Sequence, residues 1–142
     1  MNIELVEYGS LEYIQTRDLR NDILRKPLGL NLFEKDLTIE FNSMHFAVID
    51  GKAVIACVVA EPHSKSVVKI RQMAVSEPYQ GMGIGARLMI YAEKFLQKKS
   101  FTYIYLNARK DVVLFYLKLG YKCVGKEFLE ITIPHIKMEK DI

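Results

Sequence analysis

The stretch SEPYQGMGIGARLMIYAEKF, residues 76–95, joins three closely spaced glycines to an amphipathic helix pattern. Gly81, Gly83 and Gly85 alternate over five residues, and the apolar positions of a helix follow at once. One glycine is enough for the positive φ angle of a tight strand-to-helix turn, and each further glycine costs backbone entropy. Free N–H groups at the start of a helix attract anions. The stretch therefore predicts a phosphate-bearing ligand, with a purely structural turn as the alternative.

A dinucleotide site is a second alternative, because residues 81–86, GMGIGA, satisfy G-x-G-x-x-[GA]. That fingerprint follows the first strand of a βαβ unit and needs an acidic residue about 20 positions later. Here it follows the fourth predicted strand, and the next strand ends in Asn107-Ala108-Arg109 without a carboxylate. The Walker pattern also fails, since no Gly-Lys-Ser/Thr follows. NAD is thus the less favoured ligand.

Length and composition predict one soluble globular domain over residues 1–142, since 50% of the residues are hydrophobic and 26% are charged. A net charge of +3, spread along the chain, does not indicate nucleic-acid binding. The start of the chain has no signal-peptide pattern, and no apolar run approaches the roughly 20 residues of a membrane span. Cys57 and Cys123 lack the number and spacing of a disulfide framework or zinc site. We expect a cytoplasmic protein with reduced thiols and no metal.

Hydrophobic periodicity predicts an α+β fold. The crossover helix makes the strands at 66–75 and 102–109 parallel, and Asp50-Gly51 indicates a hairpin. The result is a mixed, mostly antiparallel sheet with helices on both faces. We expect strands at residues 2–8, 44–50, 52–61, 66–75, 102–109, 121–128 and 130–140, and helices at 10–26, 32–37, 84–99 and 111–119.

Two motifs resemble those of the GNAT superfamily of N-acetyltransferases. Residues 80–85, QGMGIG, read as Q-x-x-G-x-G, are similar to the loop that binds the pyrophosphate of acyl-CoA in that family. The preceding QMAVSEPYQ, residues 72–80, is close to the family's V-x-P-x-x-Q/R segment. About 30 residues after the loop, DVVLFYLKLGY, residues 111–121, resembles A-x-x-F-Y-x-K-x-G-F. The order of elements matches along nearly all of the chain.

This resemblance implies a GNAT-like sheet whose central parallel strands are splayed apart to hold acetyl-CoA as cosubstrate. The backbone of Met73, Ala74 and Val75 would hydrogen-bond the pantetheine arm, and Asn107 on the facing strand would point toward it. The amides that would hold the pyrophosphate are those of Gln80, Gly81, Met82, Gly83, Ile84, Gly85 and Ala86.

The resemblance also implies a reaction, in which a primary amine of a small molecule or peptide attacks the thioester directly. Tyr116 matches the family's tyrosine general acid, whereas Phe115 suits a core position better. A backbone N–H near Val75 would stabilise the oxyanion. From a different class, the domain could bind acyl-CoA as a sensor or interaction module without transferring anything.

A general base is harder to assign. Residues 69, 71 and 73 are expected on one face of their strand, where some family members carry a glutamate, but this chain has Lys69 and Arg71 there. Glu61, His45, His63 and His135 are candidates by residue type only. A water chain or an already neutral amine would make a dedicated base unnecessary.

The acceptor side is predicted from the first helix and the loop after it. Arg20 and Arg25, with Lys26, would make this entrance basic and favour an acceptor with a carboxylate or phosphate near its amine. Ordinary helix-surface charge is the alternative. Pro134 indicates an edge or a bulge in the last strand. An edge strand carrying residues 132–138, TIPHIKM, would support a homodimer.

Overall fold

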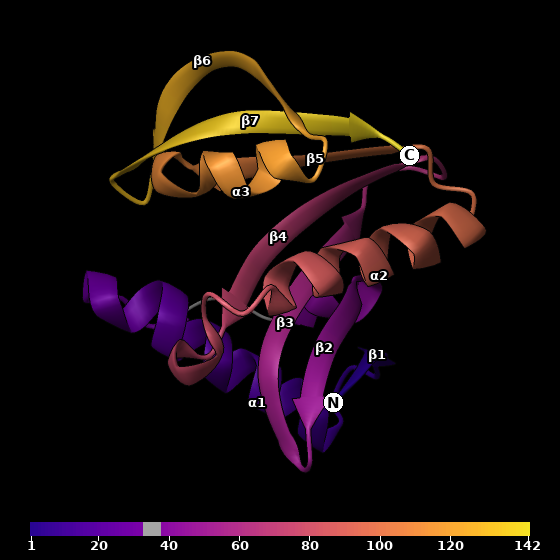
Figure 1. Cartoon of the computed structure of the whole chain (residues 1–142), viewed down its shortest axis with the longest axis vertical. Helices are drawn as coiled ribbons and strands as arrows, with labels where there is room; N and C mark the ends of the chain where they lie inside the picture. The colour runs from indigo at the N-terminus through magenta and orange to yellow at the C-terminus, as the bar shows by residue number, and fades with distance from the viewer. Residues whose placement is uncertain (33–37) are drawn as a thin grey trace.

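The computed structural model describes residues 1–32 and 38–142 and contains a seven-stranded sheet in the order β1-β2-β3-β4-β5-β7-β6 (Figure 1). β4 and β5 run parallel, and the other neighbouring pairs are antiparallel, as the sequence predicts. The strands are β1 (Asn2–Val6), β2 (Met44–Asp50), β3 (Ala53–Pro62), β4 (Val67–Val75), β5 (Tyr103–Arg109), β6 (Lys122–Glu130) and β7 (Ile133–Asp141).

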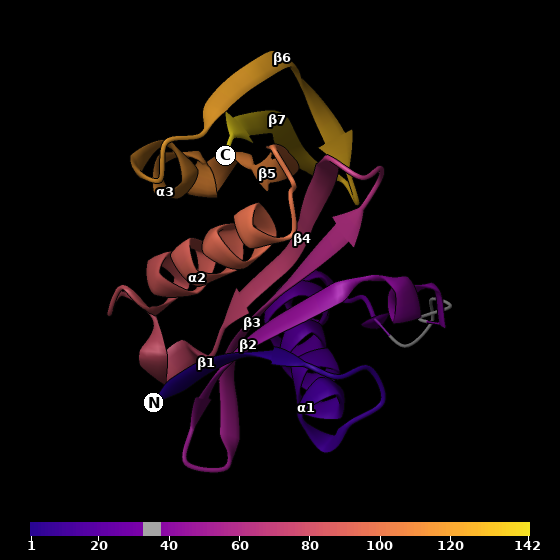
Figure 2. The same cartoon turned by 90° about the vertical axis from the view of Figure 1, so that its right-hand side faces the viewer.

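Helices cover both faces of the sheet. α1 (Leu11–Arg20) lies on one face, and α2 (Ile84–Lys98) and α3 (Val113–Lys118) lie on the other. Figure 2 shows α1 and α2 on opposite sides of the central strands. The mixed α+β fold predicted from the sequence is confirmed. The helix predicted at residues 32–37 lies outside the described residues, apart from Leu32.

The first helical segment begins and ends where the sequence predicts, but its inner face is polar. The Ser10 hydroxyl caps α1 by accepting a hydrogen bond from Tyr13 N at 3.1 Å. After Arg20 the chain continues through a π-helical turn, η1 (Asn21–Arg25), and a 3₁₀ turn, η2 (Lys26–Leu28). Tyr13, Thr16 and Arg20 are buried on this segment, whereas Leu11 is 76% exposed. A polar network therefore lies under α1.

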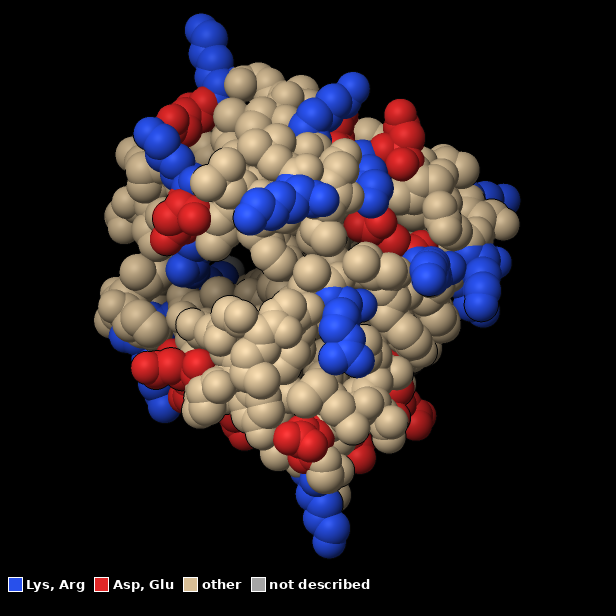
Figure 3. All heavy atoms as spheres, viewed as in Figure 1, with Lys and Arg blue, Asp and Glu red and all other residues tan. Residues whose placement is uncertain are grey.

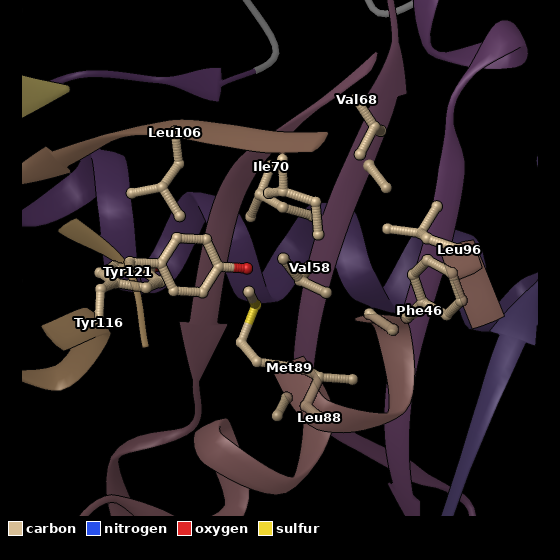
Figure 4. Close-up of a cluster of buried hydrophobic side chains, with 14 of the residues drawn as sticks. Phe46, Val58, Val68, Ile70, Leu88, Met89, Leu96, Leu106, Tyr116 and Tyr121 are labelled. Atoms are coloured by element: carbon tan, nitrogen blue, oxygen red, sulfur yellow. The ribbon is translucent and has the colours of Figure 1, made fainter. Parts of the chain in front are cut away.

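The main apolar core lies between the sheet and α2. Leu88, Met89 and Leu96 of α2 are fully buried, and Phe46 and Val68 of the strands face them (Figure 4). Burial of each such side chain stabilises the fold by about 1.5–3 kcal/mol. This packing fixes the N-terminus of α2 beside the end of β4.

The two parallel strands separate toward their C-terminal ends. Their pairing runs from Val67 opposite Tyr103 to Ile70 opposite Leu106, and stops there. Beyond that point β4 stays paired with β3, while β5 stays paired with β7 as far as Arg109. The predicted splay of the central pair is confirmed.

A β-bulge in β4 corrects one prediction. Cys57 of β3 lies opposite Ala74, but Val59 lies opposite Arg71, so β4 carries one extra residue in this interval. Gln72, with a φ of 50°, occupies it. The expected common face of residues 69, 71 and 73 is wrong, because the bulge reverses the alternation and turns Met73 toward α2.

The last strand corrects another prediction. β7 lies between β5 and β6, so the TIPHIKM segment is not at the edge of the sheet, and β6 forms that edge in the described chain. Pro134 is tolerated because pairing of β7 with β5 starts only at His135, opposite Arg109. The basis for a homodimer through residues 132–138 is therefore lost.

Candidate active site

A cavity of about 760 Å³ opens between the splayed ends of β4 and β5. Its wall on one side comes from the glycine-rich loop, α2 and α3, and on the other from η1 and from the region between β6 and β7. Figure 3 shows a hollow in the surface, with Lys or Arg atoms visible at its bottom. Such a cavity is large enough for an extended ligand arm and an acceptor.

The glycine-rich loop leaves the start of α2 open. Gly81 and Gly83 both have a φ of 77°, and no atom lies within 4 Å of a Cβ built on either. Arg87 N donates the first hydrogen bond of the helix, to Gly83 O at 3.1 Å. The N–H groups before Arg87 therefore stand outside the helical ladder, at the positive end of the helix dipole.

Gly85 has a different role. A Cβ at this position would lie 3.4 Å from both Met73 Sδ and Phe115 Cζ. The missing side chain lets α2 pack closely against β4 and α3. The three glycines thus answer two separate requirements, a left-handed backbone and a close approach.

Hydrogen bonds tie the loop to the end of β4. Gln80 Nε2 donates to Val75 O at 2.9 Å, and the Tyr79 hydroxyl donates to Asp50 Oδ2 at 2.9 Å. Ser76 N also donates to Ile55 O, at 2.8 Å. The loop is held in place before any ligand binds.

Tyr116 of α3 lines the same cavity and is only 7% exposed. Its ring packs edge-on against Phe115 and Tyr121, with centroids 4.9 and 5.7 Å away. Burial raises the pKa of the Tyr116 phenol to about 12. The phenol is therefore protonated at neutral pH and able to donate a hydrogen bond.

The matching protein-family model is an acetyltransferase (GNAT) domain, and it covers residues 30–142. The chain belongs to the GNAT family of acetyltransferases. Membership confirms the predicted enzyme class, an acyl-CoA-dependent N-acyltransferase that uses acetyl-CoA.

Two relatives from Bacillus subtilis are similar to this chain in sequence. YyaT of Bacillus subtilis (strain 168) is 32% identical over 74 residues, 52% of this chain and only 50% of YyaT. The uncharacterized N-acetyltransferase YjcF of the same organism is 29% identical over 125 residues, 87% of this chain and 88% of YjcF.

Solved GNAT-fold structures superpose along almost the whole chain. An acyl-CoA N-acyltransferase from Pseudomonas aeruginosa gives a TM-score of 0.83 at 20% identity, covering 98% of both chains. A GNAT family acetyltransferase from Elizabethkingia anophelis, crystallised with acetyl-CoA, gives 0.75 at 18% identity, covering 99% of this chain and 97% of the other. At these identities the likeness shows the fold alone.

The GNAT cavity brings together most of the residues predicted for the cosubstrate. Met82 is not among its lining residues and is 63% exposed. Asn107 lies on β5 between Leu106 and Ala108, which face the core, so its side chain is on the opposite face of the strand. The predicted residues that line the cavity are Met73, Ala74, Val75, Gln80, Gly81, Gly83, Ile84, Gly85, Ala86, Asn107 and Tyr116.

Of the four candidate bases, His135 alone is among the cavity-lining residues that the structure describes. Its Nδ1 donates to Ile133 O at 2.7 Å, which leaves Nε2 3.4 Å from Glu130 Oε2. His45 is buried, which lowers its pKa, and its Nε2 lies 2.9 Å from Glu40 O.

The other two candidates belong to a separate network. His63 Nε2 lies 2.8 Å from Glu61 Oε1, and Arg71 Nη1 donates to Glu61 Oε2 at 2.8 Å. Burial alone would raise the pKa of the Glu61 carboxyl, but these partners hold it below its usual range. Glu61 is therefore a weak base.

Arg20 is not part of the basic entrance that the sequence predicts. Its guanidinium is fully buried under α1, where Glu40 accepts hydrogen bonds from both Nη atoms at 2.9 Å. Nη1 also donates to Gln72 Oε1 at 2.6 Å. Arg25, in contrast, lines the cavity.

Sequence reasoning missed Arg109 and Glu130, which also line the cavity. Arg109 shares the strand face of Asn107 two residues earlier, so the period-two alternation of residues 102–109 was the available signal. Glu130 is the last residue of β6, and it reaches the site because β6 ends beside the cavity, which no local sequence pattern indicates.

Neither a metal-binding cluster nor a membrane-spanning helix is found in residues 1–32 and 38–142. No group of three or more His, Cys, Asp or Glu side chains is placed to hold a metal ion. No helix of these residues has the length and apolar character needed to cross a membrane.

Proposed function

We propose that this GNAT protein transfers the acetyl group of acetyl-CoA to a primary amine of a small molecule or a peptide by direct attack. The observation that carries the proposal is that the open glycine loop and the buried Tyr116 phenol face one cavity between splayed strands. A related fold crystallised with acetyl-CoA supports it.

The cosubstrate would be held mainly by backbone groups. The N–H groups of residues 81–86 suit a pyrophosphate, because the loop glycines carry no side chains and the helix dipole is positive there. Gln80, also predicted to contribute, donates its backbone N–H to Glu77 O at 3.2 Å. Met73, Ala74 and Val75 lie where β4 has lost its parallel partner, so their backbone edge is available to the pantetheine arm. Asn107 is proposed to contact the arm from β5.

The chemistry then needs few side chains. The amine nitrogen attacks the thioester carbonyl carbon, a C–N bond forms and the C–S bond breaks. The amine proton passes to His135 or to water, the leaving sulfur takes the proton of Tyr116, and the phenolate regains a proton from solvent. A backbone N–H near Val75 would stabilise the oxyanion. His135 is the described residue best placed to accept the amine proton, directly or through water.

Tyr116 is proposed to act as the general acid on the leaving sulfur. In water a thiol has a pKa of about 8.5, so a phenol of pKa about 12 would keep its proton. Burial that raises the phenol pKa also raises the pKa of a thiol in the same cavity. A hydrogen bond from Tyr116 therefore stabilises the developing thiolate first, and proton transfer completes as the charge grows.

The test is an assay of free thiol release from acetyl-CoA against a panel of primary amines. Tyr116→Phe should lower kcat by roughly 100-fold and change the acetyl-CoA Kd, measured by calorimetry, less than about 3-fold. Tyr91→Phe, on α2 and outside the cavity lining, is the matched control.

Three outcomes separate the alternatives. An unchanged kcat in Tyr116→Phe removes this residue from the mechanism. Binding of acetyl-CoA without amine-dependent thiol release indicates a non-catalytic acyl-CoA-binding module instead. Absence of any heat with acetyl-CoA contradicts the proposed function itself.

A further inference from the structure

Two arginines meet at the end of the cavity formed by η1 and β5. Arg25 Nη1 donates to Leu24 O at 3.3 Å, and Arg109 Nη2 donates to the same oxygen at 3.0 Å. Because both guanidinium groups share one acceptor, they lie next to each other. They come from segments far apart in the chain, so the fold itself gathers them.

Neither arginine has a carboxylate partner within 4.0 Å among the residues that the structure describes. Arg25 is only 8% exposed, and its Nε is buried without a hydrogen-bond partner. Burial, Arg109 and Arg71 lower the pKa of Arg25, in that order of importance. The cavity wall thus contains a buried cationic hydrogen-bond donor, the Arg25 guanidinium, whose charge is destabilised by burial and by neighbouring cations.

The surrounding carboxylates offset the charge of this pair only in part. Arg71 also lines the cavity, and Glu61 pairs with it at 2.8 Å. Glu130 lies in the wall, and its charge opposes the lowering of the Arg25 pKa, but the partner of its carboxylate within 4.0 Å is His135, at 3.4 Å. Lys69 and Asp111, which also line the cavity, contribute opposite charges. The guanidinium groups of Arg25 and Arg109 are therefore available to bind the anionic group of a ligand.

We propose that Arg25 and Arg109 bind an oxyacid group, a carboxylate or a phosphate, carried by the acceptor amine. This inference rests on the proposed function and names the acceptor class. The planar guanidinium matches both groups, because two parallel N–H bonds fit two oxygens. A ligand anion would satisfy the Arg25 Nε and offset the repulsion between the two cations.

The position of the pair favours the acceptor over the cosubstrate. η1 continues α1 on one face of the sheet, whereas the glycine loop starts α2 on the other. The cavity reaches both faces through the gap between β4 and β5. A pyrophosphate on the loop and an acid group on the arginines would therefore lie at opposite ends, with Tyr116 in the same cavity.

Matched acceptor pairs provide the first test. The probes are β-alanine against β-alaninamide and O-phosphoethanolamine against ethanolamine, each with acetyl-CoA and detection of free thiol. We expect kcat/KM at least about 10-fold higher for the anionic member of at least one pair. The probe pair that shows this difference in kcat/KM identifies the acid group of the acceptor as a carboxylate or a phosphate. Equal rates within both pairs would overturn the inference and leave acetyl transfer intact.

Variants provide the second test. Arg25→Gln and Arg109→Gln should each lower kcat/KM for the anionic acceptor by about 10- to 100-fold, and for the neutral one less than about 3-fold. Lys26→Gln is the control, because Lys26 adjoins Arg25 but is exposed and outside the cavity lining. Equal losses for both acceptors, or an equal loss in the control, would contradict an anion subsite.

A binding test separates this inference from acetyl transfer. β-Alanine or O-phosphoethanolamine should raise the melting temperature of the protein without acetyl-CoA, and Arg25→Gln should abolish that rise. Arg25→Gln should not lower the melting temperature by itself, since it removes a buried cation with an unpartnered Nε. Anion binding without acetyl transfer would keep the subsite and reject the proposed function. No rise with either anion would reject the subsite.

Discussion

Replacement of Arg20 by methionine tests whether a buried ion pair holds the β4 bulge. Arg20 makes two hydrogen bonds of 2.9 Å to the Glu40 carboxylate and one of 2.6 Å to Gln72 Oε1. The Arg20 side chain is fully buried and that of Glu40 is 13% exposed. The change leaves Glu40 without its cation and Gln72, at a φ of 50°, without its anchor.

The expected loss of unfolding free energy at pH 7 is large. Removal of one partner from a buried ion pair costs about 3–5 kcal/mol, because the remaining charge is uncompensated. Methionine fills most of the volume, so a cavity adds little. Since small domains are stable by about 5–15 kcal/mol, the variant should fold but unfold at much lower urea concentration.

The same variant has a pH signature. Burial alone would raise the pKa of Glu40, but hydrogen bonds and charge from Arg20 hold it below its usual range. In the unaltered protein Glu40 therefore stabilises the fold above about pH 4, and that stabilisation is lost as the pH falls further. Without Arg20 the Glu40 pKa rises, so the destabilisation should be largest at pH 7 and shrink toward pH 4.

Two controls make the measurement decisive. Lys26→Met breaks a 2.8 Å pair with Asp22 in which both side chains are more than half exposed, so it should cost less than about 1 kcal/mol. Adding Glu40→Gln to Arg20→Met should recover part of the loss, because the amide still accepts from the Tyr13 hydroxyl. A loss below about 1 kcal/mol for Arg20→Met, or no recovery in the double variant, refutes the reasoning.

Two further predictions concern the thiols and the glycines. Burial raises the pKa of the Cys57 thiol to about 12, so only exposed Cys123 should react rapidly with an aromatic disulfide reagent before unfolding; two fast thiols would contradict this. Gly83→Ala should lower the melting temperature, since a left-handed residue other than glycine costs about 1–2 kcal/mol. Gly85→Ala should also lower the melting temperature, but through packing, because its methyl group would lie 3.4 Å from both Met73 Sδ and Phe115 Cζ; an unchanged melting temperature in either variant would contradict the role given to that glycine.

Local sequence signals were sufficient for the arrangement of strands and helices. Ile84 and Leu88 are spaced for one helix face, and both are buried in the core against the sheet. Asp50-Gly51 joins β2 to β3, and Gly51 has the positive φ that such a turn needs. A helix between two strands of one sheet then implies the parallel pair. Each of these inferences uses residues close together in the chain.

Contacts between residues far apart in the chain could not be predicted from the sequence. Nothing in the residues around Gln72 indicates a bulge, since neither glycine nor proline stands there, and its partner Arg20 lies 52 positions away. Arg109 meets Leu24 across 85 positions. The sequence placed Arg20 at the entrance because a charged residue on a helix is usually exposed. Its contacts with the half-buried Glu40 and with Gln72 explain why this one is buried.

The bulge allows one strand to serve both ends of the cavity. Before it, Ile70 faces the core and Arg71 faces the α1 side, where Glu61 pairs with it. After it, Met73 turns to the core side and packs beside Gly85. Regular alternation would instead put Met73 on the face of Arg71 and withdraw it from α2. The buried Arg20 therefore acts on the site at a distance, because its bond to Gln72 stabilises the single residue at which β4 changes faces.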